Sequence, residues 1–241
     1  MVYSNGPSIV RDGLVLHLDA AARNSYPGSG SVWYDLSGNG NHGTFAAGTA
    51  SPTFSSDSRG CIVFGGDDYI EIPNCIDIGA GFVGTIEGCF EGNGYIISND
   101  RPSASLGEGY IRADAVNSNL RYTINSRTSS PYTYHLIHND TTNVTNNYFS
   151  VSLNVPNSTN STLNMIGDFL LNGSVQNIVT STVFSGAHHN STKIEIGRYY
   201  NHIYFTDFFT GKINFIRIYN KQLTEAEQIQ NYNATKGRFG L

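Results

Sequence analysis

Charged residues are scarce in this sequence. Asp, Glu, Lys and Arg make up 14% of the 241 residues, against about a quarter in an average globular protein. Only 14 residues are Lys or Arg, no stretch gathers them, and the formal net charge is −5. Binding to nucleic acid needs many basic side chains to neutralise phosphates. We therefore expect no nucleic-acid partner.

Long apolar runs are also missing. No segment approaches the roughly 20 apolar residues that a membrane-spanning helix requires, so we expect no membrane segment. The first residues, "MVYSNGPSIVRDG", contain neither the basic region nor the apolar region of a secretory signal. The sequence therefore gives no indication of signal-directed secretion.

Cysteine is rare, and its number is odd. Cys61, Cys75 and Cys89 are accompanied by no C-x-x-C pair, which zinc sites commonly use. We expect unpaired, buried thiols that behave as small hydrophobic side chains.

Glycine and aromatic residues are abundant, with 26 Gly, 15 Tyr and 13 Phe. Many short runs alternate between apolar and polar residues, as strands do. Examples are 13–21, "GLVLHLDAA", and 61–73, "CIVFGGDDYIEIP", in which Gly and Asp separate two strands. We predict separate strands for "GFVGTIEGCF" and "GYIIS", and a hairpin at the "NGS" of 172–174. About a dozen such strands predict an all-β sandwich or barrel.

One helix is expected, over 221–237. Thr224 followed by Glu227 forms a capping box at its start, and Gly237 is the expected stop. Residues 139–162 are rich in Asn, Ser and Thr and are interpreted as a looped insertion. No linker divides the chain, so we predict one domain over 1–241, with an N-terminal arm at 1–12 and the helix and tail at 221–241.

Four segments carry a family resemblance: "GLVLHLDAA", "WYDLSGNGNHGT", "IVFGGDDYIEI" and "GKINFIRIYNKQLTEAEQIQNYNA". In order and spacing they resemble the laminin-G/concanavalin-A-like lectin–glucanase superfamily. The resemblance covers 13–90 and 193–241 and leaves the middle, 91–192, without a match. It implies an antiparallel jelly-roll β-sandwich. It implies no single activity, because members of this superfamily bind sugars, bind proteins, hydrolyse glucans or build particles.

The ending "NYNATKGRFGL" is similar to the C-termini of structural proteins in tailed phages of cyanobacteria and other aquatic bacteria. This resemblance implies a virion protein, made in the cytoplasm of the bacterial host and displayed as a capsid decoration or on a tail fibre. Its partners would be other virion proteins, host-surface polysaccharide or both, and it would act as repeated copies or as a homo-oligomer. Two alternatives remain: a glycan-degrading enzyme or accessory carbohydrate-binding module of the glucanase type, and a secreted adhesion domain.

The carboxylates do not match the glucanase pattern. The resemblance implies three acidic residues on one strand face, in an E-x-D-x-E run. In "DDYIEI", Asp67 and Glu71 share a face but Tyr69 occupies the central place, and "TIEGCFEG" has Cys89 between Glu87 and Glu91. We therefore expect a protein that is not an enzyme.

The glycine-rich loop after Trp33 and Tyr34 has two interpretations. Asp35, Asn39 and Asn41, with Asp67 and Asp68 from the next loop, offer oxygen atoms for a structural calcium ion. Alternatively, Asp35 and its neighbours cap the amides of a tight turn, which is the interpretation we favour. The two aromatic side chains are expected to pack beneath the loop, with Trp33 in the core. Apart from calcium, no cofactor is expected.

Sugar binding usually places an exposed aromatic ring beside polar side chains. Two segments have this composition, "SSPYTYHLIHND" and "RYYNHIYFTDFF". The candidate carbohydrate-binding residues are Tyr132, Tyr134, Tyr199, Tyr200, Asn201 and His202.

Overall fold

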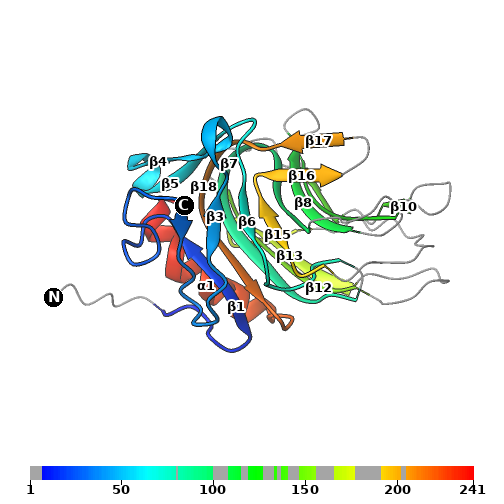
Figure 1. Ribbon diagram of the computed structural model, residues 1–241. Coiled ribbons are helices and arrows are strands. Elements are labelled where there is room, and N and C mark those ends of the chain that lie inside the picture. Colours follow the sequence, from blue (N-terminus) through cyan, green and yellow to red (C-terminus); the bar gives the residue numbers. More distant parts are fainter. Residues whose placement is uncertain are drawn as a thin grey trace.

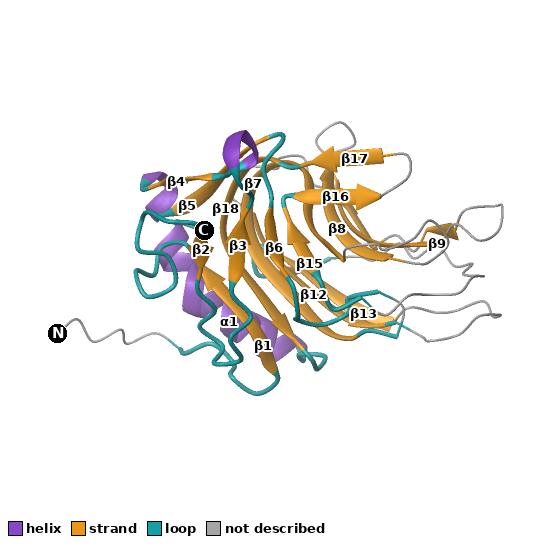
Figure 2. Ribbon diagram, viewed as in Figure 1, coloured by secondary structure: helices purple, strands orange, loops and turns teal. Residues whose placement is uncertain are grey.

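The computed structural model describes residues 7–79, 81–99, 108–114, 119–126, 133–134, 137–140, 147–155, 166–176, 191–201 and 205–241. The fold is an antiparallel β-sandwich, and the described residues include one α-helix, near the C-terminus (Figures 1 and 2). This confirms the predicted all-β jelly-roll class. In the described part of the chain, no helix is both long and apolar enough to cross a membrane.

The layer that we call the back sheet carries the helix. Its order is β1/β5, β18, β7, β12, β13 and β14, and β4 pairs with β5. The bounds are β1 Leu14–Asp19, β4 Thr53–Ser55, β5 Cys61–Gly65, β7 Val83–Asn99, β12 Asn147–Asn154, β13 Ile166–Leu171, β14 Ser174–Val175 and β18 Thr210–Tyr219.

The other layer, the front sheet, runs in the order β2, β3, β6, β15, β7, β8 and β9, and β9 pairs with both β10 and β11. The bounds are β2 Val32–Trp33, β3 Gly43–Phe45, β6 Ile70–Ile72, β8 Glu108–Asp114, β9 Asn119–Ser126, β10 Thr133–Tyr134, β11 Ile137–Asp140 and β15 Ile194–Ile196. Two short 3-10 turns, η1 Gly48–Ala50 and η2 Asp57–Arg59, connect strands. A separate hairpin, β16 Arg198–Asn201 and β17 Phe205–Phe208, packs on the outer face of the front sheet.

Strand β7 belongs to both sheets. Its first part pairs with β12 and β18 in the back sheet, and its last part pairs with β8 and β15 in the front sheet. The prediction of two separate strands here is therefore wrong. Gly92 and Gly94 have positive φ, and a Cβ on either would lie within about 2 Å of the carbonyl oxygen of Thr210 or Phe208. Only glycine allows the strand to cross between the sheets at this close approach.

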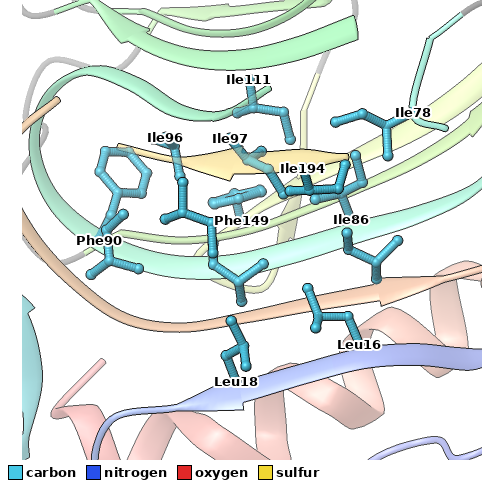
Figure 3. Close-up of a cluster of buried hydrophobic side chains, with 14 of the residues drawn as sticks. Leu16, Leu18, Ile78, Ile86, Phe90, Ile96, Ile97, Ile111, Phe149 and Ile194 are labelled. Atoms are coloured by element: carbon cyan, nitrogen blue, oxygen red, sulfur yellow. The ribbon is translucent and has the colours of Figure 1, made fainter. Parts of the chain in front are cut away.

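The core fills the space between the sheets (Figure 3). Leu16 and Leu18 of β1, Ile86 and Phe90 of β7 and Ile194 of β15 meet there, each at most 1% exposed. They occupy alternate strand positions, as the period-two pattern predicts. Trp33 is fully buried in the same core, as expected.

The segment 139–162 is more than a looped insertion. Strand β12 lies within it, is buried along most of its length, and pairs with β7 and β13. Phe149, Val151 and Leu153 face the core, while Ser150 and Ser152 face the helix side, as the alternation of side chains along a strand requires. The predicted hairpin is confirmed: β13 and β14 pair across Asn172 and Gly173, both with positive φ.

Helix α1, Glu225–Phe239, lies across the outer face of the back sheet (Figure 1). Thr224 and Glu227 form the predicted capping box. The helix continues through Gly237 and ends at Gly240, which takes the left-handed conformation. Gly237 is therefore not the stop, because a single glycine inside a packed helix costs less than the contacts that follow it.

The face of the back sheet beneath α1 is polar. The fully buried Glu87 carboxylate accepts hydrogen bonds from Tyr148 (2.9 Å), Ser150 (3.1 Å) and Asn231 of the helix (3.0 Å), and it lies 3.4 Å from Arg217. Burial raises the pKa of Glu87, while Arg217 and the hydrogen bonds oppose that rise. This network fixes the helix on the sheet by hydrogen bonds rather than by apolar contact alone.

Residues at both ends of the described chain join this layer. The Val10 amide donates to Asn231 Oδ1 (2.7 Å), and Ile9 and Val10 pack on the cluster of Leu14, Tyr219 and Leu223. At the other end, Arg238 pairs with the buried Asp19, and Phe239 stacks on Phe215 with a centroid distance of 5.4 Å. The tail therefore packs on its own sandwich.

Candidate functional site

The loop after Trp33 is held by a network centred on Asp35. Oδ1 of Asp35 accepts from the amides of His17 and Ser37 (both 2.9 Å), and Oδ2 accepts from the Asn41 amide (3.0 Å) and the Ser37 hydroxyl (2.6 Å). A carboxylate with four donors has its lone pairs occupied. The arrangement fits a turn clamp better than a calcium ligand.

The two asparagines of this loop serve the same purpose. Nδ2 of Asn39 donates to the Leu14 carbonyl (3.0 Å), and Nδ2 of Asn41 donates to the Val15 carbonyl (2.9 Å). In the next loop, Asp67 is exposed, whereas Asp68 is buried and accepts from the Gly65 amide. Within the described ranges, no three acidic, His or Cys side chains are grouped so that they would hold a metal ion. Calcium at these residues stays a prediction.

Trp33 and Tyr34 have opposite environments. Trp33 is buried, whereas Tyr34 is 44% exposed and meets the His42 ring edge-on at a centroid distance of 5.3 Å. The expectation that both aromatics pack beneath the loop is therefore wrong for Tyr34. Neighbours in extended backbone point to opposite sides, so burial of one exposes the other.

A groove of about 470 Å³ opens beside this loop. We call it the amide groove. It is lined by Asn39, Gly40, Asn41, His42, Thr44, Ile72, Pro73 and Asn74. In the part of the chain that the structure describes, Tyr34 is the one aromatic residue among the large hydrophobic side chains that are exposed, and its ring contacts His42, which lines the groove.

The groove offers unused hydrogen-bonding atoms. Asn39 and Asn41 use their Nδ2 atoms to hold the loop, and no donor among the described residues reaches either Oδ1. The Asn74 side chain is exposed and makes no hydrogen bond within the same residues. Amide groups beside an exposed ring are suited to a ligand that carries hydroxyl groups on a partly apolar ring.

The carboxylates are engaged elsewhere. Glu71 of β6 and Glu195 of β15 stand opposite each other on adjacent strands, and Lys193 Nζ lies 2.8 Å from Glu71 and 3.4 Å from Glu195. Arg198 bonds to both, with Nε 3.1 Å from Glu195 Oε2, and covers the Tyr69 ring at 3.4 Å from its centroid. Two anions held by two cations form an ion-pair network. A glycosidase instead needs one free nucleophile and one protonated acid.

The other acidic run is also accounted for. Glu87 is enclosed under α1, and Glu91 pairs with Lys212 at 3.2 Å. Sequence reasoning did not pair Glu71 with Glu195, although both lie in an Ile-Glu-Ile strand. Like charges placed directly opposite are unfavourable, so only the positions of Lys193 and Arg198 make this pairing understandable.

Among the predicted sugar-binding residues, only Tyr199 has a described side chain. Its ring is 3% exposed and stacks on Tyr95 at 4.7 Å, with Tyr110 edge-on at 5.3 Å. A ring packed in this cluster has no free face for a sugar, which corrects the stacking role expected of Tyr199. Tyr134 lies on β10, and Tyr200 and Asn201 lie on β16, with only their backbones described. Tyr132 and His202 lie outside the described residues.

All three cysteines are free, as predicted. Cys61 and Cys89 are buried and Cys75 is half-buried. Burial raises the pKa of the Cys75 and Cys89 thiols to about 12. At neutral pH these two thiols are protonated, which makes them poor nucleophiles.

Comparison with known proteins places the chain by fold. No protein-family model matches it, and no curated protein matches it in sequence. Domain 4 of AbnA, a GH43 extracellular arabinanase from Geobacillus stearothermophilus in complex with arabinotriose, is 15% identical with a TM-score of 0.56. The alignment covers 91% of this chain and 98% of that one.

Two larger proteins contain a similar unit. Trypanosoma rangeli sialidase in complex with 2,3-difluorosialic acid has a TM-score of 0.59 at 14% identity, covering 98% of this chain and 36% of the sialidase. The botulinum neurotoxin serotype D ligand-binding domain in complex with N-acetylneuraminic acid has a TM-score of 0.53 at 14% identity, covering 94% of this chain and 52% of that one. The chain thus spans about a third of the sialidase and about half of the neurotoxin domain. It shares the β-sandwich fold found in carbohydrate-binding and glycan-acting proteins.

Proposed function

We propose that this chain is a non-enzymatic, lectin-like protein that binds a glycan in the amide groove. The observation that carries the proposal is the exposed Tyr34 ring in contact with His42, which lines a groove together with amide side chains whose carbonyl oxygens accept from no donor among the described residues. The ring stacks on the apolar face of a sugar, and the amides accept from its hydroxyl groups. Several similar structures were solved with bound saccharides, which agrees with this assignment.

The absence of catalysis is part of the proposal. Glu71 and Glu195 are held in ion pairs, and Glu87 is enclosed beneath α1. These described carboxylates are therefore unsuited to the paired acid and nucleophile that glycoside hydrolysis requires.

The proposed setting is the surface of a tailed-phage particle, on the capsid or a tail fibre, where the chain meets other virion proteins and host-surface polysaccharide. The similarity of "NYNATKGRFGL" to phage structural proteins supports this setting. A shallow groove binds one glycan weakly, and repeated copies on a particle supply avidity. Peptide mass spectrometry of purified particles is expected to detect the chain, and its absence from them would contradict the setting.

The binding experiment uses purified protein and host-type envelope polysaccharides, scoring both retained protein and released sugar. Tyr34→Ala and Asn74→Ala are expected to weaken retention about tenfold, whereas Tyr34→Phe keeps the ring and retains binding. Val175→Ala removes an exposed apolar side chain from a different strand and serves as the matched control. Released oligosaccharide, or equal retention by Tyr34→Ala and the control, would overturn the proposal.

A further inference from the structure

A second pocket, separate from the amide groove, lies between the segment that follows β1, strand β4 and the turn at η2. Its volume is about 300 Å³. We call it the arginine pocket. It is lined by Ala20, Ala21, Arg23, Tyr26, Pro27, Gly28, Phe54, Ser56, Arg59 and Gly60. None of these residues lines the amide groove.

The charged groups of this pocket are both arginines. No Asp or Glu of the described residues lines it, although the whole chain carries a formal charge of −5. Arg23 makes no hydrogen bond or ion pair with the described residues. Among the described residues, Arg59 donates through Nη1 to the Gly237 carbonyl near the end of α1 (2.5 Å), and its other N–H groups have no acceptor there. Two guanidinium groups in one concave site favour an anion.

The turn that carries Arg59 is held in an unusual conformation. Ser58 and Arg59 both have positive φ, at 50° and 64°. Two consecutive non-glycine residues in this region persist only when the surroundings enforce them, and such strain gathers at functional sites.

Contacts with Asn214 and Ala21 hold the turn in this conformation. Nδ2 of the buried Asn214 donates to the carbonyls of Ser58 and Gly60, both at 3.0 Å. A Cβ on Gly60 would lie 2.8 Å from Ala21 Cα, so the turn sits directly against the pocket wall. These contacts fix the backbone on both sides of Arg59.

The opposite wall is apolar. Tyr26 is nearly buried, stacks on Phe45 at 5.4 Å and meets Phe54 at 5.5 Å. Phe54 is only half-buried and, with Pro27, gives the pocket an apolar surface. The volume is at the low end for ligand sites, which restricts the occupant to one small ring or the end of a chain.

We propose that the arginine pocket binds a carboxylated sugar residue, such as a hexuronate at the end of an acidic glycan. The carboxylate lies between Arg23 and Arg59, and the apolar face of the ring lies against Phe54. A neutral sugar does not use the arginines, and inorganic phosphate does not use the aromatic wall. The inference concerns a different site and ligand class from the amide groove and does not depend on it.

The test measures affinity at low salt by calorimetry for a glucuronate oligosaccharide, its neutral glucose counterpart and inorganic phosphate. Arg23→Ala is expected to weaken uronate binding about tenfold or more. Arg11→Ala removes the same charge from an exposed arginine that does not line the pocket, and it is expected to leave binding unchanged. Arg59→Lys keeps the charge but removes the planar fork, so a partial loss is expected. The signals of the Phe54 ring are expected to shift in the NMR spectrum when uronate binds.

Three outcomes would overturn the inference. Equal affinity for the neutral oligosaccharide would show that the arginines are not used. Equal affinity for phosphate, with no shift of the Phe54 ring, would reduce the pocket to a simple anion site. Loss of uronate binding in Tyr34→Ala but not in Arg23→Ala would place the acidic sugar in the amide groove. The proposal for the amide groove is tested separately: it fails if Tyr34→Ala does not change retention on the polysaccharide.

Discussion

His17 is a buried side chain whose protonation is expected to make the stability of the protein depend on pH. It faces outward on β1, is 7% exposed, and has no hydrogen-bond partner for either ring nitrogen among the described residues. Its Nε2 lies 3.8 Å from Asp19, too far for a hydrogen bond. Burial lowers the pKa of His17 below its ordinary 6.5, and the Asp19 contact only partly offsets this effect.

The first prediction concerns stability in mild acid. As the pH falls below about 6.5, His17 takes up a proton in the unfolded chain before it does so in the native protein, so stability decreases. His17→Phe removes this group and keeps a ring of similar shape. The fall in melting temperature between about pH 7.5 and 5.5 is therefore expected to be smaller in the variant, as measured by thermal unfolding.

In the native protein, Asp19 does not titrate within this pH window. Burial acts to raise the pKa of Asp19, but contacts with His17 and Arg238 outweigh it and hold that pKa below the ordinary 3.8. Asp19 therefore stays ionised throughout the window. An equal fall in both proteins would show that His17 is not responsible.

At the scale of elements, helix α1 is the part whose attachment can be measured most directly. It begins with a capping box, in which the Glu227 amide donates to Thr224 Oγ1 and the Thr224 amide donates to Glu227 (2.9 Å). It then contacts the back sheet mainly through polar groups. Its start and its attachment therefore depend on separate interactions.

The second prediction addresses the start of this helix. Thr224→Ala leaves the Glu227 amide without its acceptor and is expected to lower the free energy of unfolding by about 1 kcal/mol. Thr224→Ser retains the hydroxyl acceptor and is expected to keep most of the native free energy of unfolding. Urea denaturation of the three proteins measures the difference, and a midpoint that is the same for Ala as for Ser would contradict this role.

The third prediction addresses the end of the helix. Deleting residues 237–241 removes the Arg238 partner of the buried Asp19 and the Phe239 ring that stacks on Phe215. An uncompensated buried carboxylate is costly, so the free energy of unfolding is expected to fall by about 2–4 kcal/mol. Leu241→Ala, which keeps both contacts, is the milder control. Unchanged urea denaturation of the truncated chain would show that the tail does not stabilise the sandwich.

At the scale of the whole molecule, the glycine-rich loop joins β1 to the front sheet. Asp35 accepts a hydrogen bond from the His17 amide of the back sheet, and Trp33, two residues before Asp35, is buried between the sheets. The loop closes one end of the sandwich by hydrogen bonds that the protein supplies itself.

The fourth prediction follows from this arrangement. Because the Asp35 oxygens already accept four hydrogen bonds, the melting temperature is expected to be the same in EDTA and in millimolar calcium. Asp35→Asn is expected to lower the melting temperature in both buffers alike, because the amide cannot accept at both atoms. Stabilisation by calcium in the native protein but not in Asp35→Asn would establish a calcium site here.

The sequence predicted those features whose signals are local. Alternation in 13–21 and 61–73, the Asn172-Gly173 turn and the Thr224 capping box all appear where expected. The continuity of β7 was missed, because "EGNG" has the composition of a turn, and only the close approach of β18 explains its glycines.

The candidate sites were harder to predict than the fold. Tyr34 was assigned to the wrong side of the loop, and Tyr199 had the composition of a binding residue but is packed against Tyr95. The arginine pocket joins residues from three separate segments, one of which is a strained turn. No local pattern encodes such a combination, because tertiary contacts decide which side chains meet.

The strand shared by both sheets also has an evolutionary consequence. Inserting or deleting one residue within β7 would exchange the inward and outward positions of every residue beyond it. We therefore expect relatives of this protein to keep the length of β7 constant, and to diversify by lengthening or shortening the loops at the rims of the sandwich.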